Sequence, residues 1–201
     1  MRRFEPSLAR LRRFPGAREG VAAIEFAFIA PILIFFYLGM AETCQLIMAQ
    51  RRVSHSAAAL ADLVTQDTDI GQREMLEIFE AGCTILDPFP TMNMPNKLKM
   101  RVTSVIRHSP TELRVHWSRN NGRGYAALAA GAPVPFTVST PLAAVGDTVV
   151  VTEVGYRYRS SVGFLIETSD LSHRSEMRPR RSQAISFTAS TAAMPALGCS
   201  D

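Results

Sequence analysis

The sequence contains few of the residues from which catalytic and metal sites are usually built. Its 201 residues include three cysteines, four histidines and one tryptophan. It has no Cys-x-x-Cys pair and no cysteine–histidine pairing at metal-ligand spacing, which argues against a zinc site. It also lacks the G-x-S-x-G, H-E-x-x-H and P-loop motifs, which supply nucleophiles, metal ligands and phosphate cradles. We therefore expect no enzymatic activity, no metal and no cofactor.

Positive charge is concentrated in residues 1–20. The net charge of the chain is +4. A basic stretch before an apolar run marks the cytoplasmic flank of a membrane span, whereas nucleic-acid binding needs a folded basic surface. We expect residues 1–20 to be a basic cytoplasmic leader, and we expect no nucleic-acid partner. The positively charged residues of this leader are Arg2, Arg3, Arg10, Arg12, Arg13 and Arg18.

A long apolar run follows the leader. From Val21 to Ala41 the sequence contains one charged residue, Glu25. At about 1.5 Å per residue this run can cross the ~30 Å hydrocarbon layer of a bilayer. A cleaved secretory signal usually has a shorter apolar run without an acid, so we favour a retained anchor. We expect a transmembrane helix over residues 21–48 and a domain over residues 49–201 on the far side of the membrane.

Glu25 lies near the start of this run, where a carboxylate is costly in lipid. One interpretation is that its side chain reaches water at the headgroups and needs no partner. The other is that it pairs with the α-amino group of a neighbouring subunit that begins at Val21. Such a pair would favour assembly in register, because both charges must enter the low-dielectric region together. The chemistry alone leaves both interpretations open.

The residues around Gly20 form a recognisable pattern. The sequence Arg18-Glu19-Gly20-Val21-Ala22-Ala23-Ile24-Glu25-Phe26-Ala27 leads into an apolar run with Pro31 and Gly39. This pattern resembles the TadE/TadG family, pseudopilin-like proteins of the tight-adherence (Flp-type) branch of type IV pilus systems. The similarity is strongest over about residues 18–45 and extends more loosely into a later β-rich region.

The resemblance implies a processing site. In type IV prepilins a dedicated prepilin peptidase cuts after the glycine, so the matching bond is Gly20–Val21. The matching acid for recognition or assembly is Glu25. It is followed by Phe26, where Flp-type prepilins tend to have tyrosine and many TadE-like sequences have phenylalanine.

The resemblance also implies a location and partners. It implies a single pass through the bacterial inner membrane, with a cytoplasmic N-terminus and a periplasmic C-terminal domain. The implied partners are the membrane, pilus assembly proteins and the prepilin peptidase. Helix–helix contacts could also join subunits into oligomers.

Helices are expected first along the domain. One apolar helical face recurs beyond the membrane span, so the first helix should continue as a rod of about 66 Å. A second helix, capped by Asp69, should end near Leu86. The residues on the first helix's recurring face are Val53, Ala57, Leu60, Ala61 and Val64.

Strands are expected after the helices. Alternating apolar residues predict strands near residues 98–106 and 113–117 and a last strand around Ile185 and Phe187. Residues 149–158 form the strongest predicted strand, with Tyr156 and Tyr158 on one face. We interpret the region after Tyr125 as an irregular crossing loop that begins with a short helical turn, and residues 171–181 as a basic solvated loop. The expected fold is α+β and pilin-like: a long N-terminal transmembrane and amphipathic helix packed with a second helix on a small antiparallel sheet.

The three cysteines allow one disulfide. Cys44 lies in or just past the membrane span, so Cys83 and Cys199 are the candidate pair on the oxidising side. In the chain-entropy model such a long loop gains up to about 4–5 kcal/mol from closure. The alternative is that Cys83 and Cys199 are two separate buried thiols.

Two functions of different classes remain open. The first is a minor pseudopilin that assists Flp-type pilus assembly through its N-terminal helix, with possible processing by a prepilin peptidase. The second is an uncleaved, membrane-tethered periplasmic binding module of an envelope or secretion complex.

Overall fold

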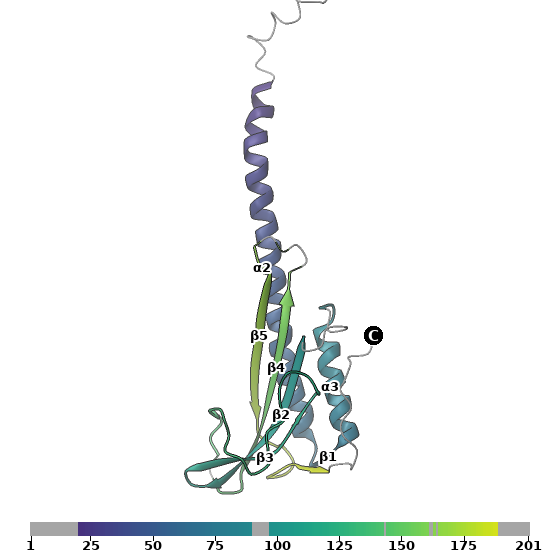
Figure 1. Cartoon of the computed structure of the whole chain (residues 1–201), viewed down its shortest axis with the longest axis vertical. Coiled ribbons are helices and arrows are strands. Elements are labelled where there is room, and N and C mark those ends of the chain that lie inside the picture. The colour runs from purple at the N-terminus through teal and green to yellow at the C-terminus, as the bar shows by residue number, and fades with distance from the viewer. Residues whose placement is uncertain (1–19, 90–96, 143, 161–162, 164, 189–201) are drawn as a thin grey trace, which may run out of the picture.

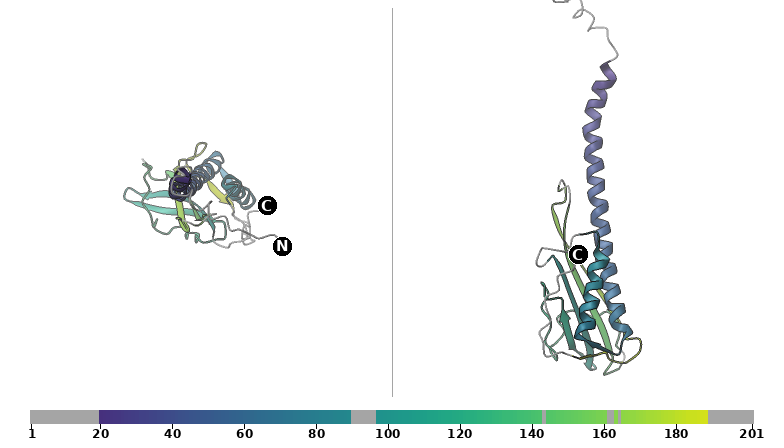
Figure 2. Two further views of the ribbon diagram at one scale, coloured as in Figure 1. Left: turned by 90° about the horizontal axis from the view of Figure 1, so that it is seen from above. Right: turned by 90° about the vertical axis from the view of Figure 1, so that its right-hand side faces the viewer.

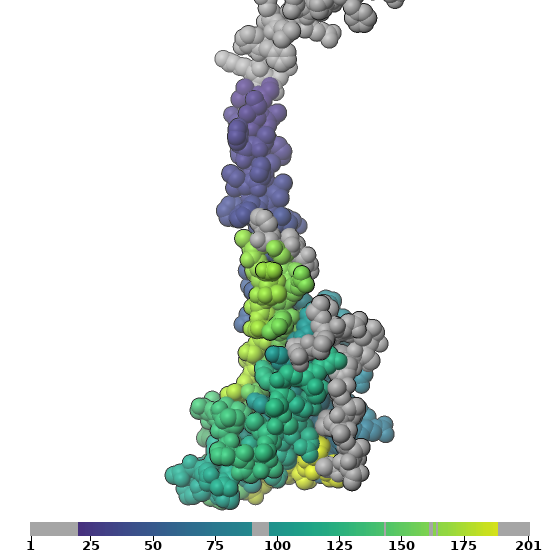
Figure 3. Space-filling view, in the orientation of Figure 1, coloured from purple at the N-terminus to yellow at the C-terminus, as the bar shows by residue number. Residues whose placement is uncertain are grey.

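The computed structural model describes residues 20–89, 97–142, 144–160, 163 and 165–188. The α-helix α2 (Val21–Gln66) is one continuous helix of 46 residues that contains Pro31. At about 1.5 Å per residue it is about 69 Å long. Its first half stands clear of the rest of the molecule, and its second half runs along the domain (Figures 1 and 3). The expected rod is therefore confirmed.

The packed half of α2 presents the face that the apolar spacing predicts. Its predicted residues are all buried, because they pack on α3 (Gln72–Leu86) and on the central sheet. α3 lies beside the lower half of α2, on the same side of the sheet (Figure 2). The residues of this face are Val53, Ala57, Leu60, Ala61 and Val64.

The central sheet has four antiparallel strands in the order β3-β2-β4-β5. The strands are β2 (Leu98–Ser109), β3 (Glu112–Asn120), β4 (Thr148–Arg159) and β5 (Thr168–Met177). Together with the two helices they form the expected α+β fold. β4 and β5 form a long hairpin that runs along α2 (Figure 1).

Both faces of the sheet are covered. On one face, apolar side chains such as Met100 and Val154 meet the two helices in the main core. On the other face, Val105, Val149 and Val151 pack against apolar residues of the long segment between β3 and β4. The central strand β4 is therefore buried along most of its length, so its sequence is apolar with little alternation.

Three local predictions need correction. The expected basic loop at residues 171–181 is mostly strand β5, an edge strand whose polar residues hide the alternation. No helical turn follows Tyr125 in the crossing loop. The helix α3 is capped by Gly71 and not by Asp69, because Glu74 Oε2 accepts the Gly71 N–H at 2.8 Å.

The expected last strand exists but joins a second, smaller sheet. β6 (Ser186–Thr188) pairs in parallel with β1 (Asp69–Gly71), in the turn before α3. Asp69 holds β6 through hydrogen bonds that its carboxylate accepts from the hydroxyls of Ser186 and Thr188. The last described segment is thus attached to the end of α2 opposite the apolar half.

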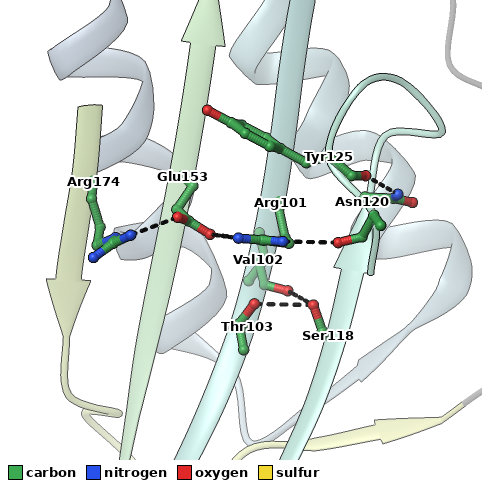
Figure 4. Close-up of polar contacts among 9 residues, drawn as sticks. Arg101, Val102, Thr103, Ser118, Asn120, Tyr125, Glu153 and Arg174 are labelled. Atoms are coloured by element: carbon green, nitrogen blue, oxygen red, sulfur yellow. Dashed lines mark hydrogen bonds and ion pairs between the residues drawn. The ribbon is translucent and has the colours of Figure 1, made fainter. Parts of the chain in front are cut away.

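A row of three charges crosses the sheet face opposite the helices (Figure 4). Arg101, Glu153 and Arg174 are direct cross-strand neighbours on β2, β4 and β5. Arg101 Nε donates to Glu153 Oε2 at 2.7 Å, and Arg174 Nη2 donates to Glu153 Oε1 at 2.9 Å. The side chains of Arg101 and Glu153 are 13% and 11% exposed. One carboxylate therefore joins three strands in a largely desolvated place.

The same row supports the crossing loop. Arg101 Nη1 donates to the carbonyl of Ala126 at 2.9 Å, and its guanidinium lies 5.3 Å from the centre of the Tyr125 ring. Tyr125 rests on the backbone of Gly155, where an added Cβ would lie 2.7 Å from the tyrosine hydroxyl. Burial raises the pKa of the Tyr125 phenol, and the Glu153 charge raises it further. A glycine in β4 thus allows the loop to cover the charges.

Glu153→Gln should destabilise the domain. It leaves the largely buried Arg101 guanidinium without its counter-charge, beside the part-exposed Arg174, which water screens. The free energy of unfolding should therefore fall by up to about 3 kcal/mol. Urea unfolding of the full chain in detergent measures this. The matched control is Asp170→Asn, which breaks the exposed Arg157–Asp170 pair of the same sheet and should leave the unfolding midpoint nearly unchanged. Equal effects of the two substitutions would contradict this role of Glu153.

Candidate functional site

The residues predicted from the sequence lie at the free end of α2. The helix begins at Val21, and Gly20 is its exposed N-cap residue. Glu25 and Phe26 are exposed in the first two turns, and no hydrogen bond or ion pair joins Glu25 to another described residue. The structure brings these four residues together only as neighbours on one helix.

A second acid on α2 has a different environment. Glu42 ends the charge-free part of the apolar run, and it is 1% exposed. It faces the β4–β5 loop, a name used here for residues 160, 163 and 165–167, which lie between the two strands of the long hairpin. Its Oε1 accepts a hydrogen bond from the Ser160 hydroxyl at 2.9 Å. Its Oε2 accepts from the backbone N–H groups of Leu165 at 2.7 Å and Ile166 at 3.1 Å.

These four residues, Glu42, Ser160, Leu165 and Ile166, are called the Glu42 cluster below. A buried carboxylate is costly unless hydrogen bonds replace its lost water. Backbone N–H groups at a loop need acceptors as well, because the strand ladder has already ended. The carboxylate and the loop therefore satisfy each other, and charge-assisted hydrogen bonds of this kind are about twice as strong as neutral ones.

Gly39 lets the loop approach the helix. It lies one turn before Glu42 on the same helical face and is buried. A Cβ at this position would lie 2.7 Å from Leu165 Cδ1. Thr43 stabilises the same turn by donating from its hydroxyl to the Gly39 carbonyl at 2.8 Å.

Tyr158 completes the surroundings of the carboxylate. It is the last inward-facing residue of β4 before the loop and is buried in the main core. Burial raises the pKa of its phenol, and the neighbouring Glu42 charge also raises it. The phenol therefore stays neutral beside the carboxylate at physiological pH, which avoids a second buried charge.

The Glu42 cluster was not predicted from the sequence. A carboxylate in an apolar run is costly, and this criterion holds for Glu42 as well as for Glu25. Its partners lie 118 to 124 residues further along the chain, so no local spacing connects them. The pattern that could have indicated the site is Gly39 followed by Glu42 at i, i+3. It places a residue without a side chain next to an acid on one helical face.

The cysteines are partly described. Cys44 is exposed on α2 and free, and Cys83 is disulfide-bonded on the buried face of α3. Cys199 lies outside the described residues, so the predicted Cys83–Cys199 pairing stays a prediction. Within the described part of the chain, no group of three or more His, Cys, Asp or Glu side chains is arranged to hold a metal ion.

The fold and the cluster define a class of protein. It is an α+β domain built on one long N-terminal helix, of which the free half is long and apolar enough to cross a membrane. Residues 20–62 match the family model described as TadE-like protein, which confirms the resemblance over the free half of α2 and most of its packed half. No curated protein and no solved structure matches the chain.

Glu42→Gln should loosen the β4–β5 loop. The amide is neutral and offers one acceptor atom, so at least one charge-assisted hydrogen bond, worth about 1.5–3 kcal/mol, is lost. Exchange of the Leu165 and Ile166 amide hydrogens should then accelerate roughly tenfold or more in hydrogen–deuterium exchange.

The matched control is Glu77→Gln, which removes an exposed acid from α3. It should leave exchange in the loop unchanged. Full protection of Leu165 and Ile166 in Glu42→Gln would show that the carboxylate does not hold the loop.

Proposed function

We propose that this chain is a membrane-anchored minor pseudopilin-like protein that assists assembly of a Flp-type (tight-adherence) type IV pilus. The match of residues 20–62 to TadE-like proteins suggests involvement in the Tad pilus system. The observation that carries the finer proposal is the division of α2. One half has apolar side chains exposed on all sides, and the other half packs one face against the folded domain.

The exposed half needs a cover. Its large apolar side chains are exposed from Val21 to Tyr37, and burying such area is favourable by about 25 cal/mol per Å². Lipid provides this cover for a single subunit. In an assembly, the helices of neighbouring subunits cover the apolar side chains instead. Because α2 is continuous with its domain, moving the helix from the bilayer into such an assembly moves the domain with it.

Charge supports one orientation in the membrane. The leader, residues 1–20, has six arginines, whereas the twenty residues that follow the expected span, 49–68, have two basic residues, Arg51 and Arg52. By the positive-inside rule the leader stays in the cytoplasm. The domain then lies in the periplasm, and the chain crosses the inner membrane once.

The start of α2 supports processing between Gly20 and Val21. Gly20 is exposed, and nothing lies within 4 Å of the position of an added Cβ. A prepilin peptidase cut there leaves an α-amino group on Val21, one helical turn from Glu25. In an assembly, Glu25 of one subunit pairs with the Val21 amine of the next, and the pair fixes their relative height.

N-terminal sequencing of the membrane-extracted protein tests the processing step. Protein from cells with an active prepilin peptidase should begin at Val21, and protein from peptidase-deficient cells should keep the arginine leader. An intact leader in both strains would favour the alternative, an uncleaved tether that presents a periplasmic binding module.

Glu25→Gln tests the assembly role. Without the charge, the amount of sheared pilus fibre should fall strongly, whereas the protein should still fractionate with the membrane. Glu77→Gln, an exposed acid on α3, serves as the control and should leave fibre yield unchanged. Normal fibre yield in Glu25→Gln cells would overturn the proposed role of this residue.

A further inference from the structure

The β4–β5 loop contacts α2 at a position that was expected to lie within the membrane span. It contacts the helix at Gly39 and Glu42, within the span expected over residues 21–48. Beyond this contact the free side of α2 still exposes Ile47 and Met48. At about 1.5 Å per residue, Met48 lies about 9 Å further along the axis than Glu42. The loop therefore sits beside a part of the helix that remains apolar on its free side.

The described part of the loop carries an exposed apolar residue. Leu165 is 54% exposed, and the only other large apolar residue outside α2 that is similarly exposed in the described part of the chain is Val145. Val145 precedes β4, at the opposite end of that twelve-residue strand. The exposed Arg159 ends β4 at the base of the loop. An apolar tip above a basic residue suits the boundary between acyl chains and anionic headgroups.

The Glu42 cluster makes the loop suitable for this boundary. Irregular backbone is costly near lipid unless its polar groups are satisfied within the protein. Glu42 accepts the N–H groups of Leu165 and Ile166, and the Ser160 N–H donates to the Glu167 carbonyl at 3.3 Å. The same contacts shield the Glu42 carboxylate, which would otherwise face hydrocarbon or headgroups alone.

We propose that the β4–β5 loop is a second membrane contact of this protein. The loop rests in the outer headgroup layer of the membrane that α2 spans, and Leu165 inserts at the acyl boundary. The Glu42 cluster holds the loop against the helix at this height. The proposal rests on the proposed membrane span of α2. Its partner is a phospholipid surface, and its consequence is a domain held at two points, which fixes its tilt against the membrane.

Quenching by brominated lipids tests this contact. The full chain is reconstituted into phosphatidylcholine–phosphatidylglycerol vesicles with or without bromine on the acyl chains, and tryptophan emission is compared. Leu165→Trp should lose emission in brominated vesicles. Val145→Trp is the matched control, because Val145 is 56% exposed at the far end of the sheet, and it should behave like the parent chain, whose only tryptophan is Trp117.

Phe36→Trp separates failure of this proposal from failure of the membrane anchor. Phe36 is 68% exposed in the free half of α2 and should be quenched if that half spans the bilayer. Quenching at position 36 without quenching at 165 would overturn the loop contact and leave the anchor intact. Quenching at neither position would overturn both.

A double variant tests the part played by the cluster. Adding Glu42→Gln to Leu165→Trp should remove most of the quenching at position 165, because the loop is no longer held at the height of the membrane. Unchanged quenching would show that the loop reaches the membrane without the Glu42 cluster.

Discussion

The structure depends on one buried carboxylate at the point where α2 passes from its free half to its packed half. Glu42 binds the Ser160 hydroxyl and two backbone N–H groups of the β4–β5 loop, and Gly39 gives the loop room to approach. Without this contact the hairpin would be joined to the upper part of the helix by apolar packing alone, which has no fixed direction. The hydrogen bonds make the helix and the hairpin one unit at this height.

The remaining elements of the domain pack around α2 and the hairpin on the side away from the free half of α2. The helices α2 and α3 cover one face of the sheet, and the crossing loop covers the other. Glu153 joins β2, β4 and β5 across the sheet, so the hairpin that meets Glu42 is itself held by a second shared carboxylate. The two acids differ in partners: backbone amides and a hydroxyl for Glu42, two guanidinium groups for Glu153. In each residue, both carboxylate oxygens accept hydrogen bonds, which offset the free-energy cost of burying the charge.

Much of this fold could be predicted from the sequence, because the spacing of apolar residues along the chain indicates the helices and most of the strands. The helical spacing of Val53, Leu60 and Val64 indicates the packed face of α2. Alternation indicates β2 and β3, and an apolar run that begins at Val149 indicates the region of β4. Strand β5 could not be predicted in this way, because it is a polar edge strand whose pairing with β4 uses the backbone. Arg174 was therefore interpreted as part of a basic loop, although it is a partner of Glu153. Glu42 was missed for a related reason, since its partners are more than a hundred residues away.

The most direct test of this account is a measurement of the contact between Glu42 and the loop in a lipid bilayer. Solid-state NMR on the full chain with ¹⁵N-leucine and δ-¹³C-glutamate detects the dipolar coupling between the Leu165 nitrogen and the Glu42 carboxyl carbon. The account predicts dephasing of the Leu165 signal that disappears in Glu42→Gln. A resolved Leu165 signal without dephasing in the parent chain would contradict it.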